Sequence, residues 1–316
     1  MSRLIHVLAP GLLTTVQDLG RDGWRHLGVA RAGALDPVAA RLANRLLGNP
    51  DDAAVLELTL QGPSLRFDAP VRIALCGRPV DARFEDTPLA FGRPIALPPG
   101  TLRLGAVRGG ARAWLAVDGG FAVPPVLGSR STDLRGGFGG HQGRALRAGD
   151  ELVLGPGDAD EPTSVQMPAW WIDPSFDAYG RDAPIRYRPA QGAPAAALAA
   201  RAWRVDAASN RQGLRLQGEA LPAVAAGGGV SEPVAPGTVQ LPPDGHPIVL
   251  LADAQTVGGY PRLGHVIAAD LPRLAQLPPH APLRFQACDA ATAEAASRRA
   301  RAELARLRLA IDARTR

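Results

Sequence analysis

The amino-acid sequence predicts a mainly β protein with two domains and a C-terminal helix. The chain has 316 residues, a length that favours two domains over one. Its 30 prolines and 36 glycines divide it into short segments, which is typical of many short strands. Several of these segments alternate apolar and polar residues, as half-buried antiparallel strands do.

The candidate strands are spread over the whole chain. They cover residues 71–75, 80–84, 101–107, 112–117, 151–154, 185–188, 213–216, 248–252 and 282–286. In one of them, Leu102, Leu104 and Ala106 alternate with Arg103 and Gly105. This period of two predicts a strand with one face buried and the other exposed.

Two helices have clear signals at their ends. The first is expected to begin after the N-cap Asp36, to carry Pro37 in its first turn and to end before Gly48. The second follows Asp289 and runs toward the C-terminus. Its apolar residues recur every three or four positions, which predicts one docked face. These residues are Ala293, Ala296, Ala300, Leu304, Leu307 and Ile311.

A change of composition near the middle of the chain suggests a domain boundary. Prolines and tryptophans replace the alternating pattern between residues 161 and 181. We therefore expect an N-terminal β domain over 1–165, a linker over 166–181, and a C-terminal β domain with the terminal helix over 182–316.

The basic residues exclude some kinds of chemistry. The net charge is +5, and all 35 basic residues are arginine because the sequence contains no lysine. The arginines are scattered rather than clustered, so a nucleic-acid partner is not expected. Without lysine, the chain has no Walker-type phosphate loop, no Schiff base and no attachment point for biotin. An anion would be held by arginine or by backbone N–H groups.

The sequence indicates a cytoplasmic protein without a metal site of its own. No apolar run approaches about 18 residues, so no membrane span is expected. The first residues lack the features of a signal peptide. Cys76 and Cys288 lie outside any metal-ligand spacing and suit a reducing compartment.

The strongest functional signal is a polar and glycine-rich block over residues 231–270, where an apolar strand leads into polar side chains. Asp253 and Gln255 are the candidate catalytic residues. Asp253 would bind an amide N–H or act as a base, and Gln255 would bind an amide in either sense. Alternatively, Asp253 caps backbone N–H groups in a turn. The candidate substrate-binding residues of the block are Ser231, Glu232, Thr256, Gly258, Gly259 and Tyr260.

The N-terminal half offers a second group of candidates. Asp18, a candidate catalytic residue, and Arg21, a candidate substrate or phosphate ligand, lie three positions apart. They would pair with each other or hold a small amide substrate together. Arg130 lies in a Ser/Thr/Asp-rich turn before the glycine cluster 136–143, which suits either an anion site or a structural loop.

Three further residues have two interpretations each. Asn210 and Arg211 lie in a segment that is either a turn entering a strand or a clamp for carboxylate or phosphate. Glu57 lies in a strand-like segment and faces either solvent or the interior. An inward Glu57 would need a partner such as Arg130 or Arg211.

Taken together, the motifs resemble one family. TVQDLGRDG, GALDPVAARLANRLLGN, LELTLQGPSLRF, GSRSTD with GGFGGHQGRAL, SNRQGLRL and LADAQTVGGYPRLGHVIAADLPRLAQ occur in this order over roughly residues 3–287. In order and spacing they are similar to the KipA-like family. That family includes the C subunit of bacterial 5-oxoprolinase, also described as allophanate hydrolase subunit 2, and is related to the carboxyltransferase part of urea amidolyase.

The resemblance implies two cyclophilin-like β-barrel domains and a role in a hetero-oligomeric enzyme. The chain would be inactive alone. With a KipI-like chain (the B subunit) and a LamB/YcsF-like chain (the A subunit), it would hydrolyse 5-oxoproline to glutamate, using ATP with Mg²⁺ in the assembled complex. Two alternatives remain. One is a biotin-dependent carboxyltransferase subunit that acts on urea or a similar amide, and the other is a non-enzymatic regulator that binds a KipI-like partner.

Overall fold

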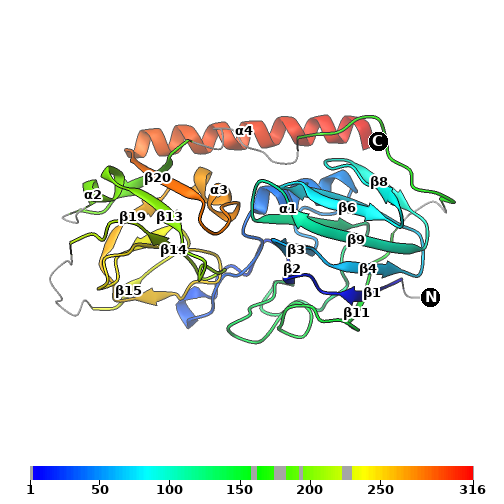
Figure 1. The fold of residues 1–316 in the computed structure, drawn as a ribbon, viewed down its shortest axis with the longest axis horizontal. Coiled ribbons are helices and arrows are strands. Elements are labelled where there is room, and N and C mark those ends of the chain that lie inside the picture. The colour runs from blue at the N-terminus through cyan, green and yellow to red at the C-terminus, as the bar shows by residue number, and fades with distance from the viewer. Residues whose placement is uncertain (1–2, 158–161, 174–182, 192–194, 223–229, 316) are drawn as a thin grey trace. The chain divides into compact units, whose positions relative to one another are not determined.

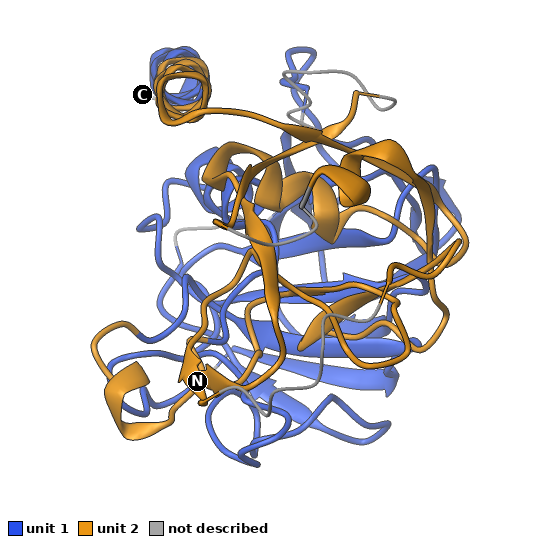
Figure 2. Ribbon diagram, turned by 90° about the vertical axis from the view of Figure 1, so that its left-hand side faces the viewer, with its two compact units in different colours: residues 1–21, 32–176, 304–316 blue, residues 22–31, 177–303 orange. Residues whose placement is uncertain are grey.

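The computed structural model describes residues 3–157, 162–173, 183–191, 195–222 and 230–315, which belong to two compact units. Unit 1 comprises residues 1–21, 32–176 and 304–316, and unit 2 comprises residues 22–31 and 177–303 (Figure 2). The predicted N-terminal domain contained residues 22–31 and the predicted C-terminal domain contained residues 304–316. In the structure, segment 22–31 belongs to unit 2 and segment 304–316 to unit 1. From residue 174 onward, the predicted linker lies outside the described residues.

Strands dominate both units, which confirms the mainly β fold class (Figure 1). Unit 1 contains a six-stranded and a five-stranded antiparallel sheet, with strand orders β11-β1-β4-β9-β6-β7 and β2-β3-β10-β5-β8. The strands of the first sheet are β1 (Leu4–Ala9), β4 (Ser64–Phe67), β6 (Val80–Phe84), β7 (Thr87–Pro88), β9 (Gly100–Val107) and β11 (Glu151–Val153). Those of the second are β2 (Leu13–Gln17), β3 (Val55–Thr59), β5 (Val71–Gly77), β8 (Pro94–Leu97) and β10 (Arg112–Val117).

The two sheets of unit 1 bury a common apolar core. Ile5 and Leu65 enter it from the six-stranded sheet, and Leu56 and Leu115 enter it from the five-stranded sheet. All four side chains are fully buried, and each stabilises the fold by about 1.5–3 kcal/mol. Strand β9 keeps the predicted alternation only at its start, because Ala106 is exposed although it shares a face with buried residues.

Unit 2 contains a closed barrel with the strand order β12-β19-β16-β17-β14-β13-β20. The parallel pairing of β12 with β20 closes it, and the other neighbours are antiparallel. Closure leaves no open sheet edge. A separate two-stranded sheet pairs β15 (Glu232–Pro233) with β18 (Val257–Gly258). The barrel strands are β12 (Ile185–Pro189), β13 (Ala202–Val205), β14 (Gly213–Gln217), β16 (Thr238–Gln240), β17 (Ile248–Leu250), β19 (Arg262–Val266) and β20 (Pro282–Ala287).

Large aromatic side chains fill part of the barrel interior. Tyr187 and Phe285 meet edge to face with their ring centroids 5.7 Å apart. Trp203 is buried, and its Nε1 donates to the carbonyl oxygen of Leu198 at 3.0 Å. The buried indole is therefore satisfied, as its polar N–H requires.

Both predicted helices are confirmed. Helix α1 (Pro37–Leu46) has Asp36 as its N-cap, whose Oδ1 accepts from the backbone N–H groups of Val38 and Ala39 at 3.1 and 3.0 Å. Helix α4 (Ala290–Thr315) begins after Asp289, which caps it in the same way. The shorter helices are α2 (Ala195–Ala200) and α3 (Leu271–Ala275).

The predicted docking face of α4 is the less exposed one. Ala296 and Ile311 on this face are 5% and 0% exposed. The last turns of the helix belong to unit 1, where Arg45 on α1 donates twice to the carboxylate of Asp312 at 2.8 Å. Across the described ranges, we find no helix with a stretch apolar and long enough to cross a membrane.

The cap of α1 gives a first test of this description. Replacing Asp36 with alanine should lower the free energy of unfolding of the full chain by about 1 kcal/mol, because two N–H groups of the first turn lose their acceptor. Asparagine at this position keeps a side-chain acceptor and should cost clearly less. Urea unfolding of both variants measures the difference, and equal losses would contradict the capping role.

Candidate functional site

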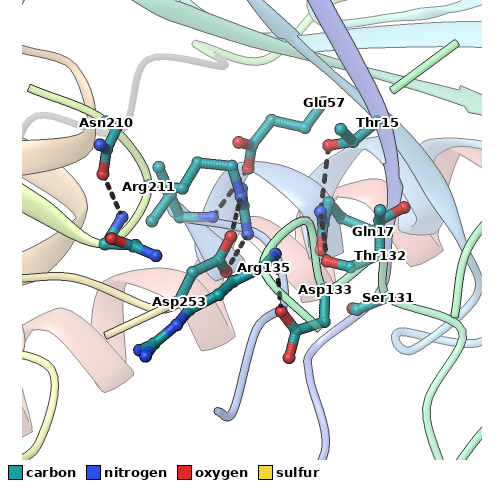
Figure 3. A network of polar contacts seen from close by, with 12 residues as sticks. Thr15, Gln17, Glu57, Ser131, Thr132, Asp133, Arg135, Asn210, Arg211 and Asp253 are labelled. Atoms are coloured by element: carbon teal, nitrogen blue, oxygen red, sulfur yellow. Dashed lines mark hydrogen bonds and ion pairs between the residues drawn. The ribbon is translucent and has the colours of Figure 1, made fainter. Parts of the chain in front are cut away.

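The turn predicted to carry the site follows β17 in unit 2, and a buried ion pair holds it. Arg211 donates through Nε and Nη2 to the two carboxylate oxygens of Asp253, each at 2.9 Å (Figure 3). The side chains are 3% and 2% exposed. The backbone N–H of Asp253 also donates to the carbonyl oxygen of Arg211 at 3.1 Å. This bidentate pairing joins the turn to the start of β14.

The ion pair bears on the roles predicted for its two members. Both oxygens of Asp253 accept hydrogen bonds from Arg211, so the guanidinium holds the carboxylate in one orientation. An anion clamp needs a free face of the guanidinium, and two of its nitrogens are committed to Asp253. Base catalysis by Asp253 and anion binding by Arg211 stay predictions. The geometry itself favours a positioning role.

The residues after Asp253 run beside the two-stranded sheet. Gln255 is partly buried, and its Nε2 lies 3.4 Å from Oε1 of Gln240. The carbonyl oxygen of Thr256 accepts from the backbone N–H of Val234 at 3.0 Å. Gly258 is the register partner of Glu232. The turn thus presents a carboxamide next to a short backbone ladder.

The other candidates of unit 2 lie at its surface. Ser231, Glu232, Gly259 and Tyr260 are exposed, and Glu232 forms an ion pair with Arg262. Asn210 is also exposed, and its Oδ1 accepts from the backbone N–H of Gln212 at 2.8 Å. Asn210 therefore closes the turn that leads into β14.

Asp18 joins two segments of unit 1 that are distant in sequence. Its Oδ1 accepts from the hydroxyls of Ser129 and Ser131 at 2.6 and 2.5 Å and from the N–H of Gly20 at 2.8 Å. Its Oδ2 accepts from the N–H of Arg130 at 2.5 Å. The side chain is buried among these donors. These bonds tie residues 129–131 to the end of β2.

Arg21 and Arg130 have different surroundings. Arg21 is 1% exposed, donates from Nη2 to the carbonyl oxygen of Ser131 at 2.5 Å, and lies 4.8 Å from the ring centroid of Phe138. Arg130 donates from Nε to the carbonyl oxygen of Val123 at 3.1 Å. It lines an open cavity of about 540 Å³ together with residues that include Asp52, Gly119, Gly120 and Pro124. An anion in this cavity would therefore meet Arg130.

Glu57 faces the interior of unit 1. Its Oε2 accepts from the backbone N–H of Leu35 at 2.8 Å and from Nε1 of Trp114 at 3.2 Å. Nε of Arg112 lies 3.7 Å from Oε1. The outward alternative is wrong, because Glu57 is 1% exposed. Arg112, on the neighbouring strand β10, is a partner that sequence reasoning did not name.

An ion pair also anchors the glycine-rich loop of unit 1. Arg144 donates through Nη1 and Nη2 to the two oxygens of Asp150, each at 2.7 Å. The hydrogen bond from Arg144 lowers the pKa of Asp150 from its ordinary value to about 2, with further help from the N–H of Arg147. Nε2 of His141 lies 3.5 Å from the same carboxylate.

Sequence reasoning missed three polar residues near these groups. Gln17 donates to Oγ1 of Thr15 and to the carbonyl oxygen of Thr132 (Figure 3). Arg25, in segment 22–31, donates to the carbonyl oxygen of Val234. Gln240 ends β16 and is 1% exposed. For the two glutamines, the only available signal was an amide within an apolar strand, which does not reveal its partner.

Comparison with known proteins gives a consistent set of relatives. Residues 27–287 match the family described as carboxyltransferase domain, subdomain A and B. The chain is 39% identical over 294 residues to the 5-oxoprolinase C subunit of Escherichia coli (strain K12), a match that covers 90% of this chain and 91% of that protein. It is 32% identical over 317 residues to the 5-oxoprolinase C subunit of Haemophilus influenzae, with 98% and 99% covered.

A solved structure resembles most of the chain. The crystal structure of the urea carboxylase of Kluyveromyces lactis aligns with a TM-score of 0.84 and 29% sequence identity. The alignment covers 96% of this chain and 29% of that much longer chain. The fold of this protein therefore occurs there as one part of a larger enzyme.

The ion pair of unit 2 should be important for stability. We expect Asp253→Asn to lower the free energy of unfolding by about 3–5 kcal/mol, because it leaves the buried guanidinium of Arg211 without its counter-charge. Glu219→Gln removes an exposed ion pair with Arg201 in the same unit and should cost no more than about 1 kcal/mol. Urea unfolding measures both, and similar small losses would contradict this account.

Asp150 should make stability depend on pH at the acidic end. Its pKa in the folded chain is about 2, below its ordinary value, so its contribution is present above about pH 4 and is lost as pH falls through 2. Asp150→Asn should cost about 2 kcal/mol at pH 7 and flatten the fall in stability between about pH 4 and pH 2. Thermal unfolding across this range tests it. An unchanged slope would argue against the pairing.

Proposed function

The chain belongs to the carboxyltransferase domain, subdomain A and B, family, and from this membership we propose that it is the C subunit of a 5-oxoprolinase. The proposal rests on similarity to these two relatives over nearly their whole length. The two relatives that are named as 5-oxoprolinase C subunits match over 91% and 99% of their own length. The urea carboxylase structure, by contrast, is matched over 29% of its chain.

The proposed reaction needs more than this chain. The relatives are named as subunits, which supports an enzyme of several chains. We propose that the partners are a KipI-like and a LamB/YcsF-like subunit, in a cytoplasmic complex. The free thiols of Cys76 and Cys288 suit that reducing compartment. In the reaction, one water adds across the lactam C–N bond of 5-oxoproline to give glutamate. Hydrolysis of ATP by a second water, to ADP and phosphate, drives the step.

We propose that the turn after β17, which carries Asp253 and Gln255, binds the lactam group of the substrate. A lactam presents an N–H beside a C=O, and a carboxamide side chain offers the complementary donor and acceptor. Gln255 is the partly exposed carboxamide of this turn, and the Arg211–Asp253 pair fixes the backbone that carries it. Asp253 acts in this proposal chiefly as a positioning residue for Gln255.

ATP with Mg²⁺ in the assembled complex is part of the proposal. Arg130 lines an open cavity, so it is our candidate contact for the phosphate groups or for a developing oxyanion. In the part of the chain that the structure describes, no three His, Cys, Asp or Glu side chains are placed to hold a metal ion. We therefore assign the Mg²⁺ to the phosphates of the nucleotide and not to a cage formed by this chain.

Carboxyl transfer is the second candidate. The family description and the urea carboxylase structure favour it. This chain contains no lysine, so biotin would have to arrive on another protein. A carboxyltransferase would then be recognised by a biotinylated partner that co-purifies with the chain.

The test is reconstitution of the complete complex. We expect the chain, mixed with KipI-like and LamB/YcsF-like subunits, to release glutamate from 5-oxoproline only when ATP is present. Glutamate release should vanish when this chain is left out. Arg130→Ala should lower ATP turnover in the same assay, while Arg83→Ala, which changes an exposed arginine of the same unit, should not.

Three other outcomes would redirect the assignment. A well-formed complex that releases no glutamate would contradict the proposal. Carboxylation of urea by that complex with a biotinylated donor would identify the carboxyltransferase alternative. Tight binding to a KipI-like partner without any turnover would identify the regulator.

A further inference from the structure

Gln240 stands at an irregularity in the barrel of unit 2. It is the last residue of β16, and the register of β16 against β19 shifts between Val239 and Gln240. Such bulges re-aim a side chain and are frequent next to active sites. The side chain is 1% exposed, so its donor and acceptor groups are withdrawn from water. A buried carboxamide of this kind needs partners on both sides.

Only one side of this carboxamide has a partner among the described residues. Oε1 of Gln240 accepts from Nε2 of Gln255 at 3.4 Å. Its Nε2 is buried and meets no hydrogen-bond acceptor within the described part of the chain. The inner carboxamide is therefore committed to Gln255, and Gln255 is the more exposed member of the pair.

Gly258 makes room for this arrangement. A Cβ atom at position 258 would lie 2.6 Å from Nε2 of Gln240, which is too close for any real contact. The backbone of Gly258 is outside the left-handed region, so the need for glycine here is one of space. A methyl group at this position would displace the end of a flexible side chain and leave the backbone ladder with Glu232 in place.

We propose that Gln240 is a positioning residue that determines which end of the Gln255 carboxamide, Oε1 or Nε2, faces the substrate. Nε2 of Gln255 donates inward to Gln240, so Oε1 of Gln255 is left to accept the N–H of a lactam. This inference rests on the proposed function and adds the origin of its specificity. The site selects substrates that carry an N–H beside the carbonyl, rather than any small cyclic carboxylate.

The proposal predicts discrimination between two ligands of equal shape. 5-Oxoproline carries the lactam N–H, and 3-oxocyclopentane-1-carboxylate has a CH₂ group in its place. One hydrogen bond of this kind corresponds to about a tenfold difference in affinity. The wild-type complex should therefore bind 5-oxoproline about ten times more tightly than the carbocyclic analogue.

The experiment measures the Kd of both ligands for the complete complex without ATP. Gln240→Leu removes the inner carboxamide, and Gly258→Ala displaces it without changing its chemistry. Each should bring the ratio of the two Kd values close to one. Gln217→Leu, an exposed glutamine on β14, is the matched control and should keep the wild-type ratio. The Gly258→Ala arm keeps the test decisive if Gln240→Leu does not fold.

The outcomes separate this inference from the proposed function. If the wild-type complex releases glutamate but both variants keep the wild-type ratio of the two Kd values, Gln240 does not orient the carboxamide of Gln255. An equal weakening of both ligands would show a purely structural role and would also overturn the inference. A wild-type complex that neither binds nor hydrolyses 5-oxoproline would refute the proposed function as well.

Discussion

In unit 2 a guanidinium and a carboxylate are held together out of water, and the candidate turn takes its position from them. Removing two such charges from water costs several kcal/mol, which only close and bidentate hydrogen bonds offset. Arg211 and Asp253 meet this condition, and their backbones are also hydrogen-bonded to each other. The residues that follow Asp253 therefore start from a fixed point at the end of a barrel strand. Gln255 and Gly258 depend on that point for their own contacts.

Unit 1 also contains a buried carboxylate, and its hydrogen-bond donors are uncharged. Asp18 is buried, and hydroxyl and backbone N–H groups surround its carboxylate. These donors belong to two segments more than 100 residues apart, so the carboxylate holds the loop around Ser131 against the end of β2. In each unit, the acidic residue that the sequence marks as a candidate for catalysis forms hydrogen bonds through both carboxylate oxygens, which favours a positioning role.

The sequence predicted the local features of the fold well. Every predicted strand is present, although the one expected over 248–252 ends at Leu250 and the one over 151–154 ends at Val153. The caps Asp36 and Asp289 are also where they were expected, because capping depends on residues only two or three positions apart. The strands that were not predicted are β1, β2, β4, β7, β8, β13, β15, β16, β18 and β19.

The parts that sequence reasoning missed are those that depend on distant residues. No local pattern shows that segment 22–31 belongs to unit 2, where Arg25 contacts Val234 across 209 positions. The partners of Asp18 come from residues 129–131, which the motif around Asp18 does not contain. Gln240 is an ordinary glutamine in the sequence. Its contact with Gln255 lies where the register of β16 against β19 shifts, a feature that no local pattern reveals.

The most direct measurement of the central claim is a crystal structure of the complete complex with bound 5-oxoproline. Our account predicts the lactam nitrogen within hydrogen-bond distance of Oε1 of Gln255, with the Arg211–Asp253 pair intact beneath it. A lactam bound away from the turn, with Gln255 making no contact to it, would contradict the account. So would an opened ion pair with Asp253 in contact with the substrate, because Asp253 would then be a catalytic residue.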